Sequence, residues 1–230
     1  MYYNDEIYDR FTMMLSNEQV EKLFSARVLV VGVGGVGGAL VHMLIRSGIK
    51  TIGIVDFDTI DITNINRQLI SNISNIGHLK VDELDKQIEQ INPEAQVIKY
   101  PYKLDENSIK DIDFLQFDYI VDCIDDIKAK KLLIKKAKEL KIPILCAMGA
   151  GNRYQGTPQF EVVDIFKTSY DKLAKIIRKF CAEERINKLP VCYTKQKPLK
   201  FDCKTIGSVV YYPISMACCM CAKVINDILQ

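Results

Sequence analysis

The sequence has few histidines, little net charge and no apolar signal segment at its start. Lys and Arg total 31 against 29 Asp and Glu, so the net charge is only +2 and favours no particular partner. His42 and His78 are the only histidines, and no Ser–His–Asp arrangement is indicated. Because the N-terminal residues contain no signal core, the eight cysteines are expected to be reduced thiols of a cytoplasmic protein, not a disulfide framework.

Long apolar stretches are also scarce. One long uncharged stretch, Thr205–Ala222, reaches the minimum length of a membrane span. However, Gly207 and Pro213 interrupt its first half and Lys223 ends it. We therefore expect no membrane span, but a buried helix with Pro213 in its first turn.

The rest of the chain is typical of one α/β domain. Short apolar runs alternate with segments of helical periodicity, which predicts a Rossmann-like, doubly wound, mostly parallel sheet with helices on both faces. The strands are expected at Arg27–Val31, Thr51–Val55, Ala95–Tyr100, Asp118–Asp122, Ile142–Ala147 and Gln159–Val163. The helices are expected at Asn17–Phe24, Val36–Ser47, Lys80–Ile91 and Ile127–Leu140, the last with its lysines outward. A single domain is expected over 1–230, with a nucleotide-binding core at 1–165 and a basic, partly helical C-terminal extension at 166–230.

A glycine-rich turn, Gly32–Gly38, follows the first expected strand and opens the first helix. In such turns backbone N–H groups and the positive end of the helix meet a phosphate. Gly32, Gly34 and Gly37 alone are weak evidence. Asp56 strengthens it, because a carboxylate at the end of the next strand reaches the ribose hydroxyls of a nucleotide.

Three further residues point to a triphosphate. Asn64 and Arg67 lie in the loop after Asp56, and Lys80 opens the next helix. Arginine holds phosphate oxygens bidentately and lysine adds a point charge, which attack at the α-phosphorus of ATP requires and NAD binding does not. Taken singly, Arg67 and Lys80 would be ordinary surface charge; together with Asp56 they favour ATP.

Two aspartates follow the fourth expected strand. Asp125 lies at the edge where ligands of open parallel sheets bind, so it is placed to hold Mg²⁺ against the triphosphate. Asp126 is expected to cap the helix that follows.

One region has a marked local charge. Residues 167–204 contain eleven lysines and arginines against four acidic residues. Such a stretch could contact nucleic acid, and it is equally consistent with a solvated, lysine-rich helix face and loop.

Five motifs over about residues 8–165 resemble those of the E1-like ThiF/MoeB/HesA superfamily: GVGGVGG (32–38), DFDTIDITNINRQ (56–68), GHLK (77–80), INP (91–93) and VDCIDD (121–126). The resemblance implies adenylation of a carboxylate with ATP and Mg²⁺. By position it implies ATP contacts at Gly32, Gly34, Gly35, Gly37, Asp56, Asp58, Asn64, Arg67, Gln68 and Lys80. It also implies catalytic parts for Arg67, Lys80 and Asp125, the last through Mg²⁺.

Three C-terminal motifs are similar to those of the TcdA branch of this superfamily: MGAGN (148–152), FEVVDIFKTS (160–169) and GSVVYYP (207–213). The resemblance implies ATP-dependent dehydration of N6-threonylcarbamoyladenosine (t6A) at position 37 of tRNA, giving cyclic t6A. Binding of tRNA would then use the basic stretch. A homodimer is implied as well.

The chain departs from the superfamily at two places. Members carry an N-terminal arginine that reaches into the ATP site of the partner subunit, and here only Arg10 is offered, followed by methionines. The paired C-x-x-C zinc ligands are absent. Only Cys218 and Cys221 have that spacing, in an apolar stretch, so zinc is not predicted. Cys192 and Cys203 are candidates for sulfur chemistry, although a bystander role is simpler for both.

Three other functions stay open. The first is adenylation of a ubiquitin-like sulfur-carrier protein, with an unknown sulfur-transfer partner; the missing zinc module counts against it. The second is an NAD-dependent oxidoreductase, which leaves Arg67, Lys80 and Asp125 without a role. The third is a non-catalytic scaffold, supported only by the altered N-terminus.

Overall fold

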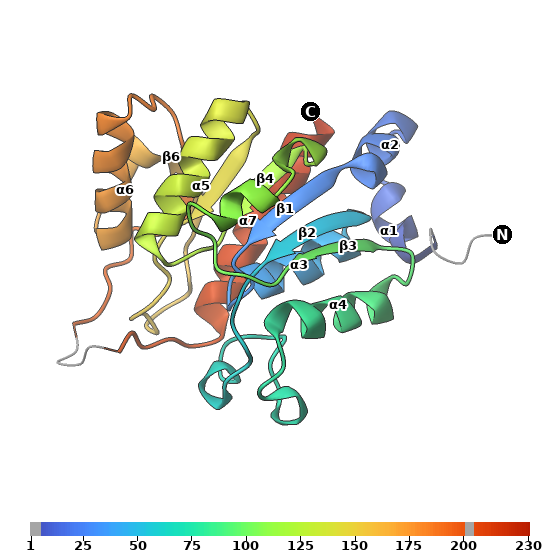
Figure 1. Ribbon diagram of the computed structural model, residues 1–230, viewed down its shortest axis with the longest axis horizontal. Helices are drawn as coiled ribbons and strands as arrows, with labels where there is room; N and C mark the ends of the chain where they lie inside the picture. The colour runs from blue at the N-terminus through green and yellow to red at the C-terminus, as the bar shows by residue number, and fades with distance from the viewer. Residues whose placement is uncertain (1–5, 201–204) are drawn as a thin grey trace.

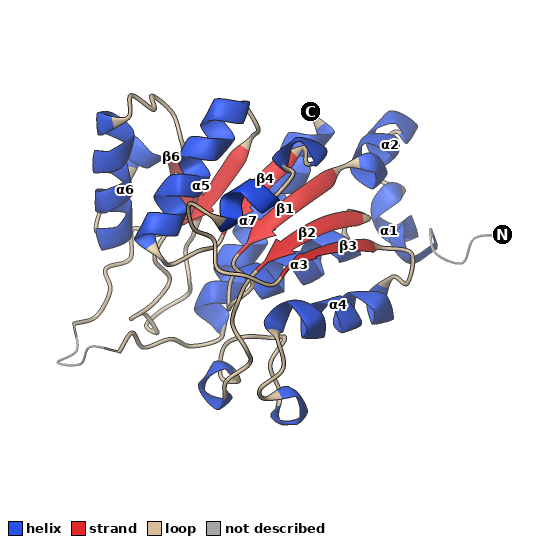
Figure 2. Ribbon diagram, in the orientation of Figure 1, coloured by secondary structure: helices blue, strands red, loops and turns tan. Residues whose placement is uncertain are grey.

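The computed structural model describes residues 6–200 and 205–230, and its centre is a seven-stranded sheet (Figures 1 and 2). The strand order is β3-β2-β1-β4-β5-β7-β6, and only the β6–β7 pair is antiparallel. The strands are β1 (Arg27–Val31), β2 (Thr51–Val55), β3 (Gln96–Tyr100), β4 (Tyr119–Asp122), β5 (Ile144–Ala147), β6 (Glu161–Asp164) and β7 (Pro190–Tyr193). The predicted α/β class is confirmed. β7 was not predicted.

Strand β1 lies inside the sheet, between β2 and β4, and shows why the core has two halves. Its residues Val28 to Val31 are all buried, as a strand covered on both faces requires. Successive side chains point to opposite faces. Accordingly, Val28 and Val30 belong to one hydrophobic cluster and Leu29 and Val31 to the other.

Helices cover both faces of the sheet (Figure 1). The cluster that contains Val28 also holds buried side chains of α2, α3, α4 and α7, whereas the cluster that contains Leu29 holds those of α5 and α6. The helices are α1 (Asp9–Thr12), α2 (Asn17–Ser25), α3 (Gly37–Arg46), α4 (Lys80–Ile91), α5 (Ile127–Leu140), α6 (Lys172–Glu183) and α7 (Tyr211–Leu229). The chain reverses its direction along the sheet between β1 and β4. In open sheets this switch point, at the carboxyl ends of the strands, is where ligands bind.

Helix α7 has the length and hydropathy of a membrane span, but it packs as a core helix. Met216 and Met220 are fully buried, and the helix lies along α3. Pro213 lies in its first turn, as predicted, where a missing N–H costs no intrahelical bond.

The long loop after β2 is irregular apart from two short 3₁₀ turns. These are η2 (Ile62–Asn64) and η3 (Ile73–Asn75), each stabilised by an Asx side chain at its start and an Asn at its end. The loop places residues 56–68 beside the glycine-rich turn, because Asp56 accepts a hydrogen bond from the backbone N–H of Val33.

Candidate nucleotide-binding site

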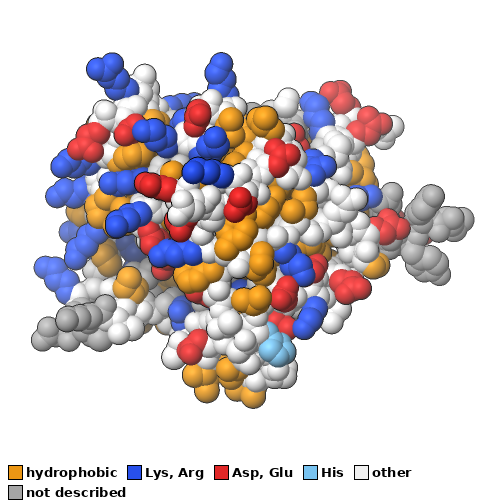
Figure 3. Space-filling model, in the orientation of Figure 1, with side chains coloured by type: hydrophobic (Ala, Val, Ile, Leu, Met, Phe, Trp, Pro, Cys, Tyr) orange, Lys and Arg blue, Asp and Glu red, His pale blue; other side chains and the backbone are white. Residues whose placement is uncertain are grey.

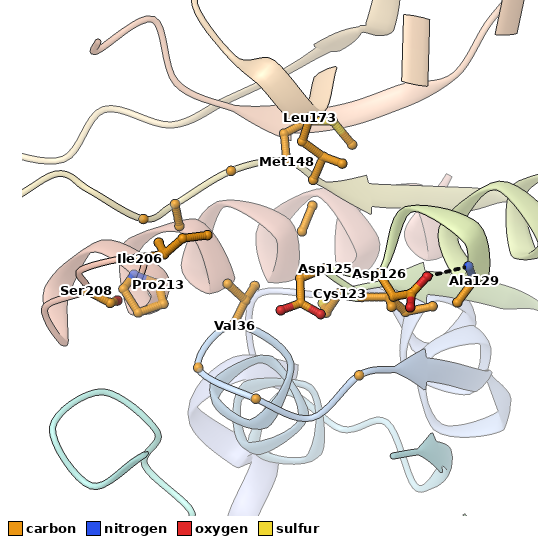
Figure 4. Close-up of a pocket in the computed structure, with 18 of the residues that line it drawn as sticks. Val36, Cys123, Asp125, Asp126, Ala129, Met148, Leu173, Ile206, Ser208 and Pro213 are labelled. Carbon is orange, nitrogen blue, oxygen red and sulfur yellow. Dashed lines mark hydrogen bonds between the residues drawn. The ribbon is translucent and has the colours of Figure 1, made fainter. Parts of the chain in front are cut away.

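A cavity of about 760 Å³ lies at the carboxyl edge of the sheet. Its wall includes the glycine-rich turn, the loop after β2, the β4–α5 turn, the loop after β5, and the starts of α6 and α7. Figure 4 shows Val36 and Asp125 on one side of this space and Met148, Leu173 and Ile206 on the other. The volume lies in the range of small-molecule sites.

Steric constraints fix the glycine-rich turn. Gly32 has a φ of +86°, and a Cβ there would lie 2.9 Å from the carbonyl oxygen of Cys123. A Cβ at Gly37 would lie 1.8 Å from the carbonyl oxygen of Gly32. Gly34 and Gly35 line the cavity. The turn therefore brings backbone amides and the start of α3 to the cavity, as a phosphate site requires.

Asp56 supports this turn from the end of β2. One carboxylate oxygen accepts a hydrogen bond from Val33 N (2.8 Å), and the other accepts one from Asp58 N (2.9 Å). Burial raises the pKa of Asp56, although Lys80 and the two backbone bonds oppose the rise. The carboxylate lines the cavity and keeps free lone pairs for a ribose hydroxyl.

Lys80 and Asp58 form an ion pair at the same edge. The distance from Lys80 Nζ to Asp58 Oδ2 is 2.7 Å, and the Lys80 side chain is 5% exposed against 46% for Asp58. The sequence predicted contacts to ATP for both residues. In the structure they also pair with each other, so Asp58 holds the lysine in place at the cavity wall.

Asn64, Arg67 and Gln68 occupy the loop that faces the glycine-rich turn. Asn64 Oδ1 accepts a bond from Asp61 N (3.1 Å), and Arg67 Nη1 donates to Thr63 O (2.6 Å). Gln68 is 6% exposed, and its Oε1 has no hydrogen-bond partner within residues 6–200 and 205–230. An unsatisfied buried oxygen costs about 1–3 kcal/mol, so this site is prepared for a donor from a ligand.

The two aspartates of the β4–α5 turn have different surroundings (Figure 4). Asp126 accepts hydrogen bonds from Lys128 N and Ala129 N, which lower its pKa, so the predicted helix cap is confirmed. Asp125 is exposed at the cavity and makes no hydrogen bond or ion pair with the part of the chain that the structure describes. Its carboxylate is therefore available to a cation.

A buried ion pair lies beneath this turn. Lys130 Nζ donates to Asp122 Oδ2 (2.7 Å) and to the carbonyl oxygen of Ala147 (3.1 Å), and both charged side chains are 0% exposed. Asp122 Oδ1 also accepts from Ile124 N, next to Asp125. Burial acts to lower the pKa of Lys130, but Asp122 outweighs it and raises the pKa. The expectation that all lysines of this helix point outward is wrong for Lys130.

The far half of the cavity was not predicted as a site. Met148, Leu173, Ile176 and Ile206 give it an apolar wall. Arg153, which is 5% exposed, donates to the carbonyl oxygens of Gly149, Gly151 and Gln196. This half can enclose a second ligand beside the nucleotide.

Comparison with known proteins agrees with this architecture. The family model described as "ThiF family" matches residues 8–230. The chain belongs to the ThiF family. A tRNA threonylcarbamoyladenosine dehydratase of Bacillus subtilis is 36% identical over 193 residues, which cover 84% of this chain and 76% of that protein. The protein of the same name from Escherichia coli is 32% identical over 205 residues, covering 89% and 75%.

Solved structures show the same fold. E. coli TcdA in complex with AMP superposes on this ThiF-family chain with a TM-score of 0.91 and 24% identity, covering 98% of this chain and 94% of that one. The E. coli TcdA complex with ATP gives a TM-score of 0.90, also at 24% identity, with the same coverage.

Other predicted residues of this ThiF-family chain lie away from the cavity. Arg10 is exposed on α1 and does not line the cavity of its own subunit. Cys192 is fully buried in β7 and its pKa is raised by a hydrogen bond to Cys219 and by burial, so it is not available as a nucleophile. Cys203 lies outside the described residues. Cys218 is exposed and Cys221 buried, and among the described residues no cluster of metal-ligating side chains occurs.

Proposed function

We propose that this chain is an ATP-dependent tRNA threonylcarbamoyladenosine dehydratase. The observation that carries the proposal is a single cavity with two halves. One half holds the features of an ATP site, and the other is a space with an apolar wall next to it. Curated relatives with this name align along most of their length.

The chemistry follows from placing the two substrates side by side. A carboxylate is a poor electrophile, so an oxygen of the t6A carboxylate first attacks the α-phosphorus of ATP and pyrophosphate leaves. An atom of the same nucleoside then attacks the acyl carbon and AMP leaves, which closes the ring of cyclic t6A. In total the nucleoside loses one water, and the oxygen atom lost from the carboxylate remains on the phosphate of AMP.

Each step uses residues already at the cavity. Arg67 and Lys80 would stabilise negative charge on the phosphoryl oxygens as pyrophosphate leaves. Gln68 Oε1 and Asp56 would orient the nucleotide through hydrogen bonds. Because Asp125 is unpaired in the described chain, it would hold Mg²⁺, which neutralises triphosphate charge.

Assembly and location are also part of the proposal. Arg10 does not line the cavity of its own subunit. If Arg10 takes part in the reaction, a second subunit must supply it, and we therefore propose a homodimer. We expect the enzyme in the cytoplasm, where its thiols remain reduced.

One alternative within the family has support of its own. Adenylyltransferase and sulfurtransferase UBA4 of Meyerozyma guilliermondii is 35% identical over 135 residues, but these cover only 31% of that protein. Activation of a sulfur-carrier protein predicts a reactive cysteine near the site, and the burial of Cys192 speaks against it.

Adjacent aspartates provide the test of the proposed site. We expect Asp125→Asn to lower the rate of tRNA dehydration by at least about 100-fold, since transition-state charge stabilisation is worth that much. Asp126→Asn keeps the helix cap and serves as the matched control with near wild-type rate. Arg67→Ala should also abolish the reaction in a folded protein.

The measurement is the loss of t6A from tRNA per enzyme and minute, with circular dichroism as the check on folding. Equal rates for the Asp125→Asn and Asp126→Asn variants would refute the assignment.

A further inference from the structure

The positive charge of the chain is concentrated on two neighbouring helices. α5 and residues 172–188 carry twelve lysines and arginines against three glutamates, a net charge of +9. Since the whole chain carries +2, the remaining residues carry −7. Figure 3 shows Lys and Arg side chains gathered over α5 and α6. A charge separation of this size within one domain indicates a surface for a polyanion.

The lysines of α5 form a row beside α6. They follow one another at intervals of three and four residues, so they share one side of the helix over about 15 Å. The row consists of Lys128, Lys131, Lys135 and Lys138. Lys131 Nζ lies 5.3 Å from the ring centre of Phe180 on α6, and Lys135 Nζ lies 3.0 Å from Glu184 just after it. The row therefore adjoins α6.

Helix α6 and the segment after it extend the row into a face. The exposed lysines of α6 lie opposite its buried side, which includes Ala174 and Ile177. Glu183 and Glu184 each pair with one lysine of this surface, and the net charge of +9 already includes them. We define the basic face as Lys128, Lys131, Lys135, Lys138, Lys172, Lys175, Lys179, Arg185 and Lys188.

One end of the basic face meets the cavity. Lys172 lines the cavity together with Leu173 and Ile176. Just before them, Tyr170 is 61% exposed and has a φ of 55°, a left-handed conformation that tyrosine rarely adopts. The next residue, Asp171, accepts a hydrogen bond from Gly149 N in the cavity wall (2.8 Å). Tyr170 thus precedes the cavity-lining residues 171–173 directly in the chain, and the centre of its exposed ring lies 4.7 Å from Lys197 Nζ.

We propose that the basic face binds the phosphate backbone of tRNA, and that Tyr170 stacks on a base where the chain enters the cavity. The inference rests on the proposed function, and names the surface that delivers the modified nucleotide. A row of cations that ends near an exposed aromatic ring and the cavity fits RNA, whose unpaired bases stack on aromatic side chains. An acidic protein would need neither the ring nor the space.

A pair of triple variants with equal charge change tests the face. The face variant is Lys128→Gln, Lys175→Gln and Lys188→Gln; none of these lysines forms an ion pair within residues 6–200 and 205–230. The control variant is Lys22→Gln, Lys86→Gln and Lys110→Gln, on other elements. The affinity for t6A-containing tRNA is measured between 50 and 200 mM salt, about the range in which phosphate contacts dominate.

We expect the face variant to bind tRNA on the order of tenfold more weakly, with a salt dependence (the slope of log K against log salt) about three smaller in magnitude. ATP affinity should equal that of the wild type, which shows that the fold is intact. The control should match the wild type in both tRNA affinity and salt dependence.

Tyr170 is tested separately. Tyr170→Ala should lower the affinity for tRNA about fivefold or more without changing the salt dependence, and Tyr170→Phe should restore it, because stacking needs the ring and not the hydroxyl. Equal tRNA affinity of the face and control variants would overturn the inference. The basic face would then be a binding surface for an acidic protein instead. Failure of the proposed function is distinct: the wild type would then not dehydrate tRNA at all.

Discussion

Asp56 shows how one half-buried carboxylate links the fold to pH dependence. Burial raises its pKa above the ordinary 3.8. Hydrogen bonds from ribose hydroxyls favour the ionised form, which exists above the pKa and is lost below it. We therefore predict that ATP affinity falls on acidification at a pH higher than an ordinary aspartate would cause. Calorimetric titration between about pH 7 and pH 4.5 measures this.

The phosphates of ATP also titrate in this range, so an Asp56→Asn variant is required as reference. Its affinity will be lower throughout, and its residual pH dependence reports ATP alone. If wild type and variant show parallel curves, Asp56 does not contact the nucleotide in its ionised form.

The residues of the site were predicted unevenly for a physical reason. Glycines and Asp56 were predictable, because a close backbone approach and a strand end each demand a particular residue type. The Asp58–Lys80 pair was not predictable, and neither was the Gln68 oxygen that has no partner among the described residues, because both depend on how the loop at 56–68 folds.

At the scale of elements, the Asp122–Lys130 pair connects α5 with β4 and β5. Replacing Lys130 with Met leaves the buried carboxylate of Asp122 without an opposite charge, which we expect to destabilise the protein by about 3–5 kcal/mol. Urea unfolding gives this free energy. The additional substitution Asp122→Asn removes the buried charge, while the asparagine oxygen can still accept the hydrogen bond from Ile124 N. The double variant should therefore recover at least about half of the lost unfolding free energy. No recovery would mean that packing of the lysine stem, not charge, is responsible.

Elements differed in how well the sequence predicted them. The buried strands β1 and β2 stand out as apolar runs and were placed with the observed bounds. β7 has only four residues and lies in the basic stretch, so no run marks it. The position of α6 was missed, although Asp171 as N-cap and buried Ala174, Ile177 and Cys181 at helical spacing are detectable signals.

At the scale of the whole molecule, the position of Arg10 makes a prediction about subunits. Arg10 lies on α1, whereas the cavity is lined from the glycine-rich turn to α7. If a homodimer supplies Arg10 in trans, Arg10→Ala and Asp125→Ala proteins will each be inactive alone. Co-expressed, they should regain about a quarter of wild-type activity, because half the dimers are mixed and each contains one intact site. Activity that stays at the level of the separate variants would exclude a shared site.

The central claim is that ATP drives the loss of water from t6A in tRNA. The most direct measurement is mass analysis of tRNA nucleosides after incubation of the wild-type protein with t6A-containing tRNA, ATP and Mg²⁺. We predict that t6A is replaced by a nucleoside lighter by one water, with one AMP and one pyrophosphate formed for each conversion. Unchanged t6A, with pyrophosphate released only when a small carrier protein is added, would contradict the account.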